Sequence, residues 1–414
     1  MRDEILSNLD NPEQLERLYR IDKSAFKKEF KTLDTEIKDN SLLSFWNARL
    51  NYTRDDISWG TGKDLVFILL AALVAGVISR VPAIFNIDQE YFYQRNIGFI
   101  IFPMLSAYFA WKNNLPIGKI VFIVGTALAG LVFINFLPDN KKSDTLILSC
   151  IYLLIFLWSV IGFAFTGTFG NNPQKRLDYL KYNGDLLVMT ALIVIAAGIL
   201  SGVTIGLFSL IGFNIEIFYR ENIIASGLPA APILATYLIR SNPQLVGKVS
   251  PVIAKIFSPL VLVMLVIYTI AIIYSGKDPY NDREFLLIFN GLLIGVMALI
   301  FFSVAEASQN ANKKMESLIL FLLSMVTIVV NGVALSAILF RISEWGLTPN
   351  RAAVLGSNIL ILINLLLVTA ALYKVVARKT HISTVGKSIV HFLPVYFFWA
   401  AIVTFLFPFL FGFK

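Results

Sequence analysis

The sequence predicts an all-α membrane protein: a polytopic bundle of about eleven transmembrane helices, preceded by a small soluble helical domain. The chain of 414 residues is 57% hydrophobic and only 15% charged, with a mean hydropathy of +0.72. Soluble domains carry about 25% charged residues, so this chain has too few charges to cover a water-soluble globule of its size. Apolar runs near the ~20 residues that cross the hydrocarbon core of a bilayer recur from Asp64 onwards.

Residues 1–62 differ in composition from the rest of the chain and predict a small helical domain. The stretch Asn11-Pro12-Glu13-Gln14 is typical of a helix start, with Asn as the N-cap and Pro as the first helical residue. A second helix is predicted by one apolar face, formed by Phe26, Phe30, Leu33 and Ile37. A third is predicted from Ser41 onwards. Because so short a domain cannot build a large core alone, we expect it to contact the membrane part or a cytoplasmic partner.

Eleven apolar runs follow, and each is predicted to be a transmembrane helix. They cover residues 64–85, 97–112, 117–137, 145–167, 186–213, 223–239, 256–276, 285–305, 316–340, 353–377 and 389–411. The second and sixth runs are short and are interrupted by proline, at Pro103 in one and at Pro229 and Pro232 in the other.

The loops between the runs alternate in their content of basic residues. Of the Lys and Arg residues in these loops, most follow even-numbered runs, and the chain as a whole carries a net charge of +8. Cytoplasmic loops are enriched in Lys and Arg. We therefore expect the N-terminal domain in the cytoplasm and the C-terminal Lys414 outside.

Two nearly identical stretches indicate an internal duplication. FNIDQEYFYQRN at 85–96 and FNIEIFYREN at 213–222 align at their Phe-Tyr pairs, and Pro103 then falls on Pro229. The interval contains four helices, and because four is even the two copies point the same way through the membrane. The predicted organisation is therefore two parallel four-helix repeats and a three-helix C-terminal segment, at residues 63–184, 185–314 and 315–414.

Residue patterns for catalysis or metal binding are nearly absent. The chain has two histidines, His381 and His391, and one cysteine, Cys150. No H-E-x-x-H, C-x-x-C or Walker sequence is present. We therefore predict no catalytic residue, no metal site and no cofactor. The sequence contains no basic run with interleaved aromatic residues, so it does not indicate a nucleic-acid partner.

Four polar residues of the apolar runs are candidates for ligand binding. Arg80 lies near the outer end of the first run, where it either reaches the interface or attracts an anion to an inner pocket. Asn331, Asn358 and Asn364 lie at membrane depth, where an amide must find a partner. They either bond across the seam between the ninth and tenth helices or line a polar cavity.

Small residues indicate where helices approach closely. The predicted packing positions are Gly198, Gly202 and Gly206 in the fifth run and Gly291 and Gly295 in the eighth. Packing is the preferred interpretation, and a moving hinge is the alternative.

The loop at 341–351 is the most distinctive in the chain. Gly346 permits a turn, Thr348-Pro349 is typical of a helix start, and Trp345 is suited to the membrane interface. Arg341 and Arg351 bracket the loop. Two interpretations stay open: a rigid turn, or a contact with an anion or lipid headgroup.

The sequence of this loop, R-I-S-E-W-G-L-T-P-N-R, resembles the R-x-x-x-Y-G-x-T-x-x-R element of the bacterial multi-pass membrane proteins grouped as the domain of unknown function 4153 family. The resemblance covers roughly residues 60–411, with Trp345 where the family usually has Tyr. It implies a bacterial inner-membrane protein, and it carries over no catalytic residue.

Three classes of function fit the sequence, and a transporter or permease-like protein is preferred because of the parallel repeats, the proline-interrupted helices and the polar residues in helices nine and ten. An enzyme acting on a lipid-linked or anionic substrate is the first alternative, with Arg80, Arg341 and Arg351 holding phosphate. A signalling or scaffold subunit is the second, with residues 1–62 as its output. Expected partners are membrane lipids, an anionic lipid or small-molecule ligand, and a cytoplasmic protein.

Overall fold

The computed structural model divides the chain into two compact units, Met1–Ser58 and Trp59–Lys414. It describes residues 4–5, 7–8, 11–21, 26, 29–30 and 46 of the first unit, and 62–140, 142–167, 172–210, 214–243, 256–267, 269–270, 283–307 and 314–414 of the second. Residues 206–207, 209–210, 283–289, 307 and 314 are described by their backbone only. All regular elements among the described residues are helices.

The first unit contains helix α2, Pro12–Ile21, and a small aromatic core. The Asn11 side chain accepts a hydrogen bond from the Gln14 backbone N–H at 3.2 Å, which is the N-cap geometry that the sequence predicts. The rings of Phe26, Phe30 and Trp46 are buried against one another. Leu33 and Ile37, predicted to extend this apolar face, lie outside the described residues.

Seven helices of the second unit are long and apolar enough to cross a membrane. They are α5 (Gly62–Phe85), α7 (Ile117–Phe136), α8 (Asp144–Thr166), α9 (Pro173–Leu210), α15 (Lys314–Trp345), α16 (Pro349–Val376) and the last helix, composed of α17 (Ile382–Ala401), the π-helix η2 (Ile402–Leu406) and α18 (Phe407–Leu410). A pair bent by 42° is an eighth candidate, with α10 (Glu216–Phe218), η1 (Tyr219–Ile224) and α11 (Ala225–Gly227) before the bend and α12 (Ala230–Ser241) after it. The chain is therefore a multi-span helical membrane protein.

The predicted number of eleven spans is not confirmed. The remaining predicted runs correspond to α6 (Gln89–Lys112), to an apolar helix at Ile256–Ile267 and to α14 (Arg283–Ala307). The stretch 256–267 is shorter than a bilayer crossing, and α6 carries the buried polar residues Arg95 and Asn96. The described part of the chain supports seven or eight spans.

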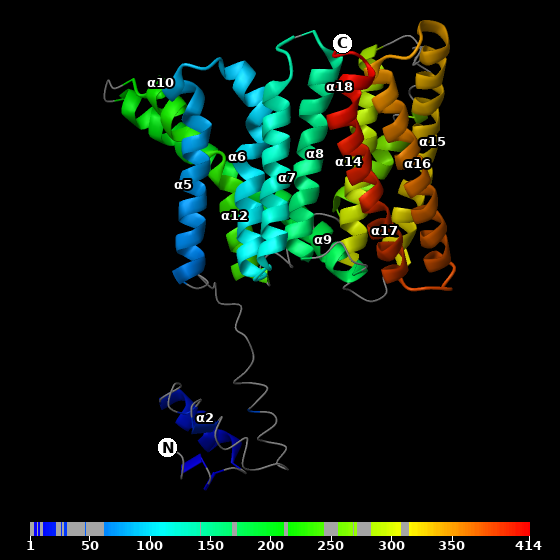
Figure 1. Ribbon diagram of the computed structural model, residues 1–414. Helices are drawn as coiled ribbons and strands as arrows, with labels where there is room; N and C mark the ends of the chain where they lie inside the picture. The colour runs from blue at the N-terminus through cyan, green and yellow to red at the C-terminus, as the bar shows by residue number, and fades with distance from the viewer. Residues whose placement is uncertain are drawn as a thin grey trace. The chain divides into compact units, whose positions relative to one another are not determined.

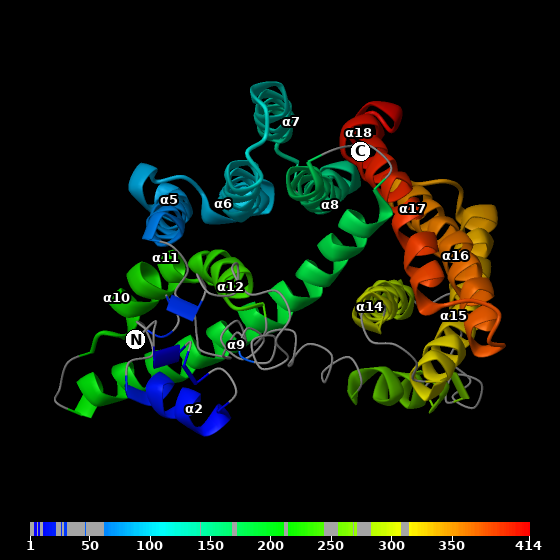
Figure 2. The same cartoon turned by 90° about the horizontal axis from the view of Figure 1, so that it is seen from below.

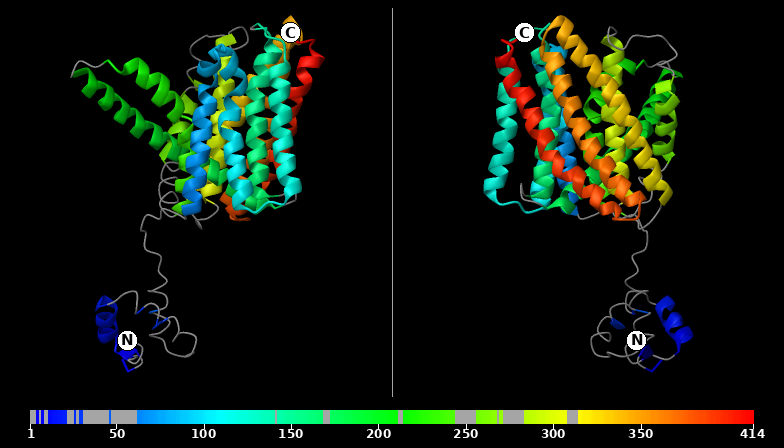
Figure 3. Two further views of the ribbon diagram at one scale, coloured as in Figure 1. Left: turned by 60° about the vertical axis from the view of Figure 1, so that its left-hand side comes forward. Right: turned by 90° about the vertical axis from the view of Figure 1, so that its right-hand side faces the viewer.

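Two apolar cores hold the second unit together. The first joins α5, α6, α7, α8 and α12, with Ala400 of α17, and the second joins α14, α15, α16 and α17. The first turns of α9 contribute to both cores, with Tyr179 and Tyr182 in the first and Leu177 and Leu180 in the second. Helix α9 runs obliquely past both of them, from the side of α8 and α17 towards α10 (Figure 2). In the second half, α15, α16 and α17 lie side by side (Figure 3, right).

The turn after α5 and the start of α10 lie at the same end of the second unit, the upper end in Figure 1, as parallel repeats require. The turn between α15 and α16 lies at this end too, and the turn between α16 and α17 lies at the lower end. The matching helices nevertheless differ in length, with 24 residues in α5 and 38 in α9. The repeat architecture is therefore not confirmed.

Proline 394 interrupts the hydrogen bonding of α17, and a neighbouring helix repairs the interruption. A proline has no backbone N–H, so the carbonyl four residues earlier loses its helical partner. In α17 that carbonyl belongs to Val390, and the guanidinium Nη1 of Arg176, from the start of α9, donates to it at 3.2 Å. Arg176 thereby couples α9 to the break in α17.

The same repair occurs at two other prolines. Ser149 Oγ donates to Thr404 O at 2.8 Å, four residues before Pro408, and Ser79 Oγ lies 3.0 Å from Ala225 O, four residues before Pro229. Ser79 shares its single proton between Ala225 O and Gly76 O of its own helix, which is 2.7 Å away. In each case a hydroxyl from another helix replaces the missing N–H. Because an unpaired carbonyl in hydrocarbon costs several kcal/mol, these contacts fix which helix lies beside each break.

Candidate functional site

A group of polar side chains lies among the apolar helices of the second half of the unit, and we call it the polar seam. Its hydrogen-bonded members are Tyr152 of α8, Asn290 of α14, Ser357, Asn358 and Asn364 of α16, and Tyr396 and Trp399 of α17. We include Asn331 of α15 because it is a buried amide at a similar depth. Polar groups inside a membrane bundle are rare and are typical of ligand pathways. The polar seam is therefore the candidate functional site.

Helical periodicity explains which neighbours the polar residues of α16 meet. Ser357 and Asn364 are two turns apart and share one face, and both bond to α17. Ser357 Oγ accepts from Trp399 Nε1 at 3.0 Å, and Asn364 Nδ2 donates to Tyr396 Oη at 3.0 Å. Asn358 is one position after Ser357 and therefore lies on a different face of α16, away from α17.

Asn358 is bonded to α14, because its Nδ2 donates to Asn290 Oδ1 at 2.8 Å. The sequence left open whether these amides bond between α15 and α16 or line a cavity. Asn358 and Asn364 do not bond to α15 among the described contacts. Their described partners belong to α14 and α17.

A glycine allows the tryptophan of the polar seam to approach α16. A Cβ atom added at Gly356 would lie 2.1 Å from the ring of Trp399. The Trp399 indole then reaches Ser357 Oγ, which also lies 2.6 Å from the hydroxyl of Tyr152. Three helices, α8, α16 and α17, thus meet at one serine.

Asn331 and Asn364 carry polar atoms without a hydrogen-bond partner, although both side chains are 0% exposed. These atoms are Nδ2 and Oδ1 of Asn331 and Oδ1 of Asn364. A buried polar group left unpaired costs about 1–3 kcal/mol. Such groups require an explanation, often a water, an ion or a ligand.

The two amides lie at the same depth. Asn331 precedes the end of α15 at Trp345 by 14 residues, and Asn364 follows the start of α16 at Pro349 by 15. At 1.5 Å per residue, both lie roughly 20 Å from the turn that joins these antiparallel helices. Each occupies the buried face of its helix. The structure thus brings two predicted binding residues, Asn331 and Asn364, to one central level.

Hydrogen bonds of Arg351 and Thr348 hold the loop at 341–351. Arg351 Nη1 donates to the carbonyls of Trp345 at 2.8 Å and Gly346 at 2.6 Å, and so pairs two carbonyls at the end of α15. Arg341 and Arg351 each lie 5.6 Å from the Trp345 ring. Thr348 caps α16 by accepting from the Arg351 N–H. These predicted residues come together, but at the upper end of the unit and away from the central level (Figure 1).

Arg80 has a different neighbourhood from the polar seam. Its Nη1 donates to the backbone carbonyl of Glu221, and its Nη2 donates to Asn222 Oδ1 at 3.0 Å. Both partners belong to the π-helix η1, so Arg80 holds the bent pair against α5. In Figure 1, α5 and α10 lie at the opposite side of the unit from α15 and α16.

The glycines predicted to mediate helix packing lie in open surroundings. Among the described residues, no atom of another helix lies within 4 Å of a Cβ added at Gly198, Gly202, Gly291 or Gly295. Gly206 is described by its backbone only. Their packing role stays a prediction. Close approach occurs instead at Gly184 and Gly356, where an added Cβ would meet the rings of Phe302 and Trp399.

A buried ion pair lies outside the polar seam. Lys181 Nζ of α9 is 3.6 Å from Glu306 Oε2 of α14, and the Glu306 side chain is 4% exposed. The pair joins α9 to the last turn of α14. The members of the polar seam themselves carry no formal charge. No group of three or more His, Cys, Asp or Glu that could hold a metal ion occurs within the described residues.

Sequence reasoning missed Tyr152, Asn290, Tyr396 and Trp399 in the polar seam and Arg176 at the break in α17. Aromatic residues are ordinary in apolar helices, so Tyr152, Tyr396 and Trp399 carry no local signal. Asn290 does carry one, because it is an amide inside the apolar run 285–305. The Pro394 break is visible in the sequence, but the arginine that repairs it is remote along the chain.

No family model, curated protein or solved structure matches this chain. The resemblance of residues 341–351 to the domain of unknown function 4153 family therefore stays a prediction.

Proposed function

We propose that the chain is a permease-like membrane transport protein whose ligand binds at the polar seam. The observation that carries the proposal is the pair of fully buried amides, Asn331 and Asn364, with unpartnered polar atoms at one central depth. Transporters bind their substrates near the bilayer midplane, where side chains of several helices converge. A ligand there would supply the missing partners.

The last helix supports a role in movement. Tyr396 and Trp399 lie between the break at Pro394 and the π-helix η2, so two interruptions flank the residues that contact α16. Prolines and π-helices mark bends and functional positions in helices. Discontinuous helices commonly form the binding sites of transporters. Bending of α17 at these points would open or close the polar seam.

The chemistry of the polar seam favours a small, polar ligand without net charge. Its members offer amide donors and acceptors, hydroxyls and an indole N–H, and none of them is ionised at neutral pH. An enzyme acting on an anionic substrate is less well supported. The arginines expected to hold phosphate, Arg80, Arg341 and Arg351, lie outside the polar seam, and the polar seam itself contains no cation.

For location, we propose the inner membrane of a bacterium, with the N-terminal unit in the cytoplasm. The support is the bias of Lys and Arg towards loops after even-numbered runs, together with the resemblance at residues 341–351.

Cysteine accessibility tests the proposed transport site. Cys150 is the only cysteine, so Cys150→Ser provides a background without thiols. In that background we expect Asn331→Cys and Asn364→Cys to react with a membrane-impermeant thiol reagent in sealed vesicles, from one side or both, because a transport pathway admits water. Leu365→Cys is the matched control, since Leu365 is equally buried in the apolar core. If the two asparagine positions react as slowly as position 365 from both sides, the bundle is closed and dry. That result would contradict the transport proposal and favour a signalling or scaffold subunit.

A further inference from the structure

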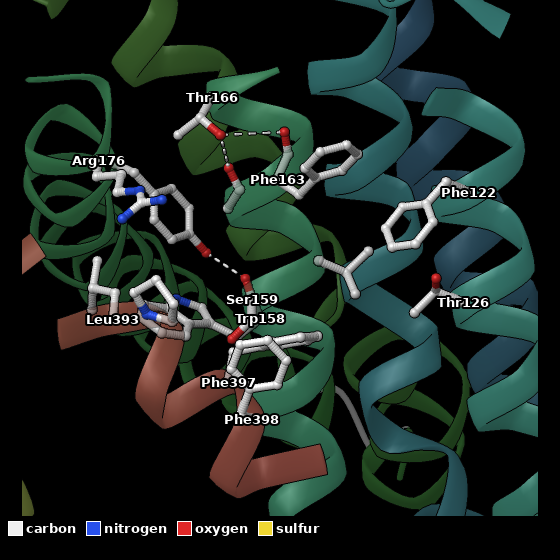
Figure 4. A pocket seen from close by; sticks show the side chains of 14 residues that line it. Phe122, Thr126, Trp158, Ser159, Phe163, Thr166, Arg176, Leu393, Phe397 and Phe398 are labelled. Atoms are coloured by element: carbon white, nitrogen blue, oxygen red, sulfur yellow. Dashed lines mark hydrogen bonds between the residues drawn. The ribbon is translucent and has the colours of Figure 1, made fainter. Parts of the chain in front are cut away.

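An amphipathic groove lies between α7, α8, α17 and the start of α9 (Figure 4). It encloses a cavity of about 380 Å³. The residues that matter here define what we call the aromatic groove: Phe122 of α7, Trp158 and Phe163 of α8, Phe397 and Phe398 of α17, and Arg176 of α9. The phenyl rings enclose the space, and the guanidinium of Arg176 lies towards one end of it (Figure 4).

The aromatic groove opens on the membrane-facing surface of the unit. The side chains of Phe122 and Phe398 are 42% and 63% exposed, although they belong to apolar helices. In a bilayer these surfaces face acyl chains rather than water. Because its lining is mostly apolar and aromatic, the cavity suits a hydrocarbon chain.

Basic residues gather at one end of the aromatic groove, where α8 ends. Thr166 lines the groove, and its carbonyl accepts a hydrogen bond from Lys175 Nζ at 3.3 Å. Lys119 Nζ donates to the carbonyl of the next residue, Gly167. Arg176, adjacent to Lys175, is the single charged residue among those described that line the groove. The groove therefore has an apolar body and a cationic end.

We propose that the aromatic groove binds an anionic phospholipid, with one acyl chain along the rings and the headgroup phosphate between Lys175 and Arg176. Charge complementarity selects this occupant, because the cationic end matches a phosphate and the apolar body matches a chain. The Lys175 side chain is exposed, and Arg176, which also donates to Val390 O, is the cation among the described residues that line the groove. The lipid would thus lie beside the Pro394 break in α17.

The test is photocrosslinking with purified full-length protein in nanodiscs. The probe is phosphatidylglycerol with a photoreactive group at the end of one acyl chain, in a phosphatidylcholine background. We expect crosslinks at residues 122–126 or 397–398. We also expect unlabelled phosphatidylglycerol to compete at least tenfold more strongly than unlabelled phosphatidylcholine.

Three variants separate the parts of the proposal. Lys175→Gln combined with Arg176→Gln should reduce crosslinking at least fivefold, and Lys175→Gln alone serves if the double variant fails to fold. Ser159→Phe should abolish crosslinking with both cations intact, because Ser159 lines the groove and its hydroxyl bonds only to its own helix among the described contacts. Lys379→Gln, an exposed lysine in the turn after α16, is the control and should change nothing.

Two results would overturn the proposal. The first is a loss of selectivity: phosphatidylcholine competes as well as phosphatidylglycerol, or crosslinking survives removal of both cations in a folded protein. Either observation would show that the groove is a non-selective apolar surface. The other is crosslinking unaffected by Ser159→Phe, which places the lipid elsewhere. Neither result bears on the cysteine accessibility of the polar seam, so this proposal and the proposed transport function fail independently.

Discussion

At the scale of single residues, arginines and serines of this chain act as substitutes for missing backbone partners. Arg95 is a further example: its buried guanidinium Nη1 donates to the carbonyls of Ile134 at 2.6 Å and Leu137 at 3.1 Å, at the end of α7. Carbonyls at helix ends and four residues before prolines are predictable acceptors. Several side chains that resemble ligand-binding residues therefore have a structural role.

Arg351 provides a direct test of that role. Arg351→Ala should lower the stability of the detergent-solubilised protein by about 0.5–1.5 kcal/mol, since it removes the hydrogen bonds to two carbonyls at the exposed end of α15. Arg351→Lys should recover little of the loss, because an ammonium lacks the planar fork. Thermal unfolding with and without anionic lipid measures the effect, and we expect the same loss in both. Arg220→Ala, an exposed arginine at the same end, is the control. A loss seen only with anionic lipid would instead identify a headgroup site.

The repair at Pro408 predicts a specific epistasis. Ser149→Ala should destabilise the protein by about 1–3 kcal/mol, because Thr404 O loses its donor. In a Pro408→Ala background the restored N–H can serve that carbonyl, so the same substitution should cost clearly less. A double-mutant cycle of unfolding free energies measures the coupling. Ser159→Ala serves as the control, since that hydroxyl bonds within its own helix. Additive costs would show that the serine has no such role.

At the scale of helices, a glycine packed against a neighbouring ring and a glycine in open surroundings should respond differently to an added methyl group. Gly356→Ala should destabilise the protein, because the added Cβ overlaps the Trp399 ring and separates α16 from α17. Gly202→Ala should be neutral or stabilise α9 by up to about 1 kcal/mol, because no described neighbour is close and Ala favours helix. Thermal unfolding of the two variants, side by side, measures the difference. A damaging Gly202→Ala would indicate a packing partner on that stripe.

The predicted apolar runs and the helices of the structure do not always begin at the same residue. Apolar runs predicted at 64–85, 117–137 and 145–167 agree with α5, α7 and α8 within about two residues. Helix α9 begins at Pro173 rather than at 186, and α17 begins at Ile382 rather than at 389. Both early starts are polar stretches. A helix satisfies its own backbone whether or not lipid surrounds it, so hydropathy marks the hydrocarbon and not the helix end.

At the scale of the whole molecule, the distribution of basic loops predicts its orientation. In a Cys150→Ser background, Ser7→Cys should resist a membrane-impermeant thiol reagent in intact cells, whereas Asn140→Cys should react. Asn140 is exposed in the turn between α7 and α8, at the upper end in Figure 1. Permeabilised cells, in which both positions should react, provide the control. The reverse pattern in intact cells would invert the topology.

The sequence by itself determined that this is a helical membrane protein and approximately where its apolar helices lie. Those properties depend on short stretches of chain: about 20 apolar residues span a bilayer, and each helix pairs its own backbone. It also placed Asn331, Asn358 and Asn364 at membrane depth.

Only the tertiary structure decided which of these residues meet. Asn364 contacts Tyr396, 32 residues away, and Arg176 reaches the carbonyl of Val390 across 214 residues. Such pairs depend on which helices become neighbours and on how each is rotated about its axis. In this chain those choices follow from packing and from unpaired carbonyls at proline breaks, which no single helix contains.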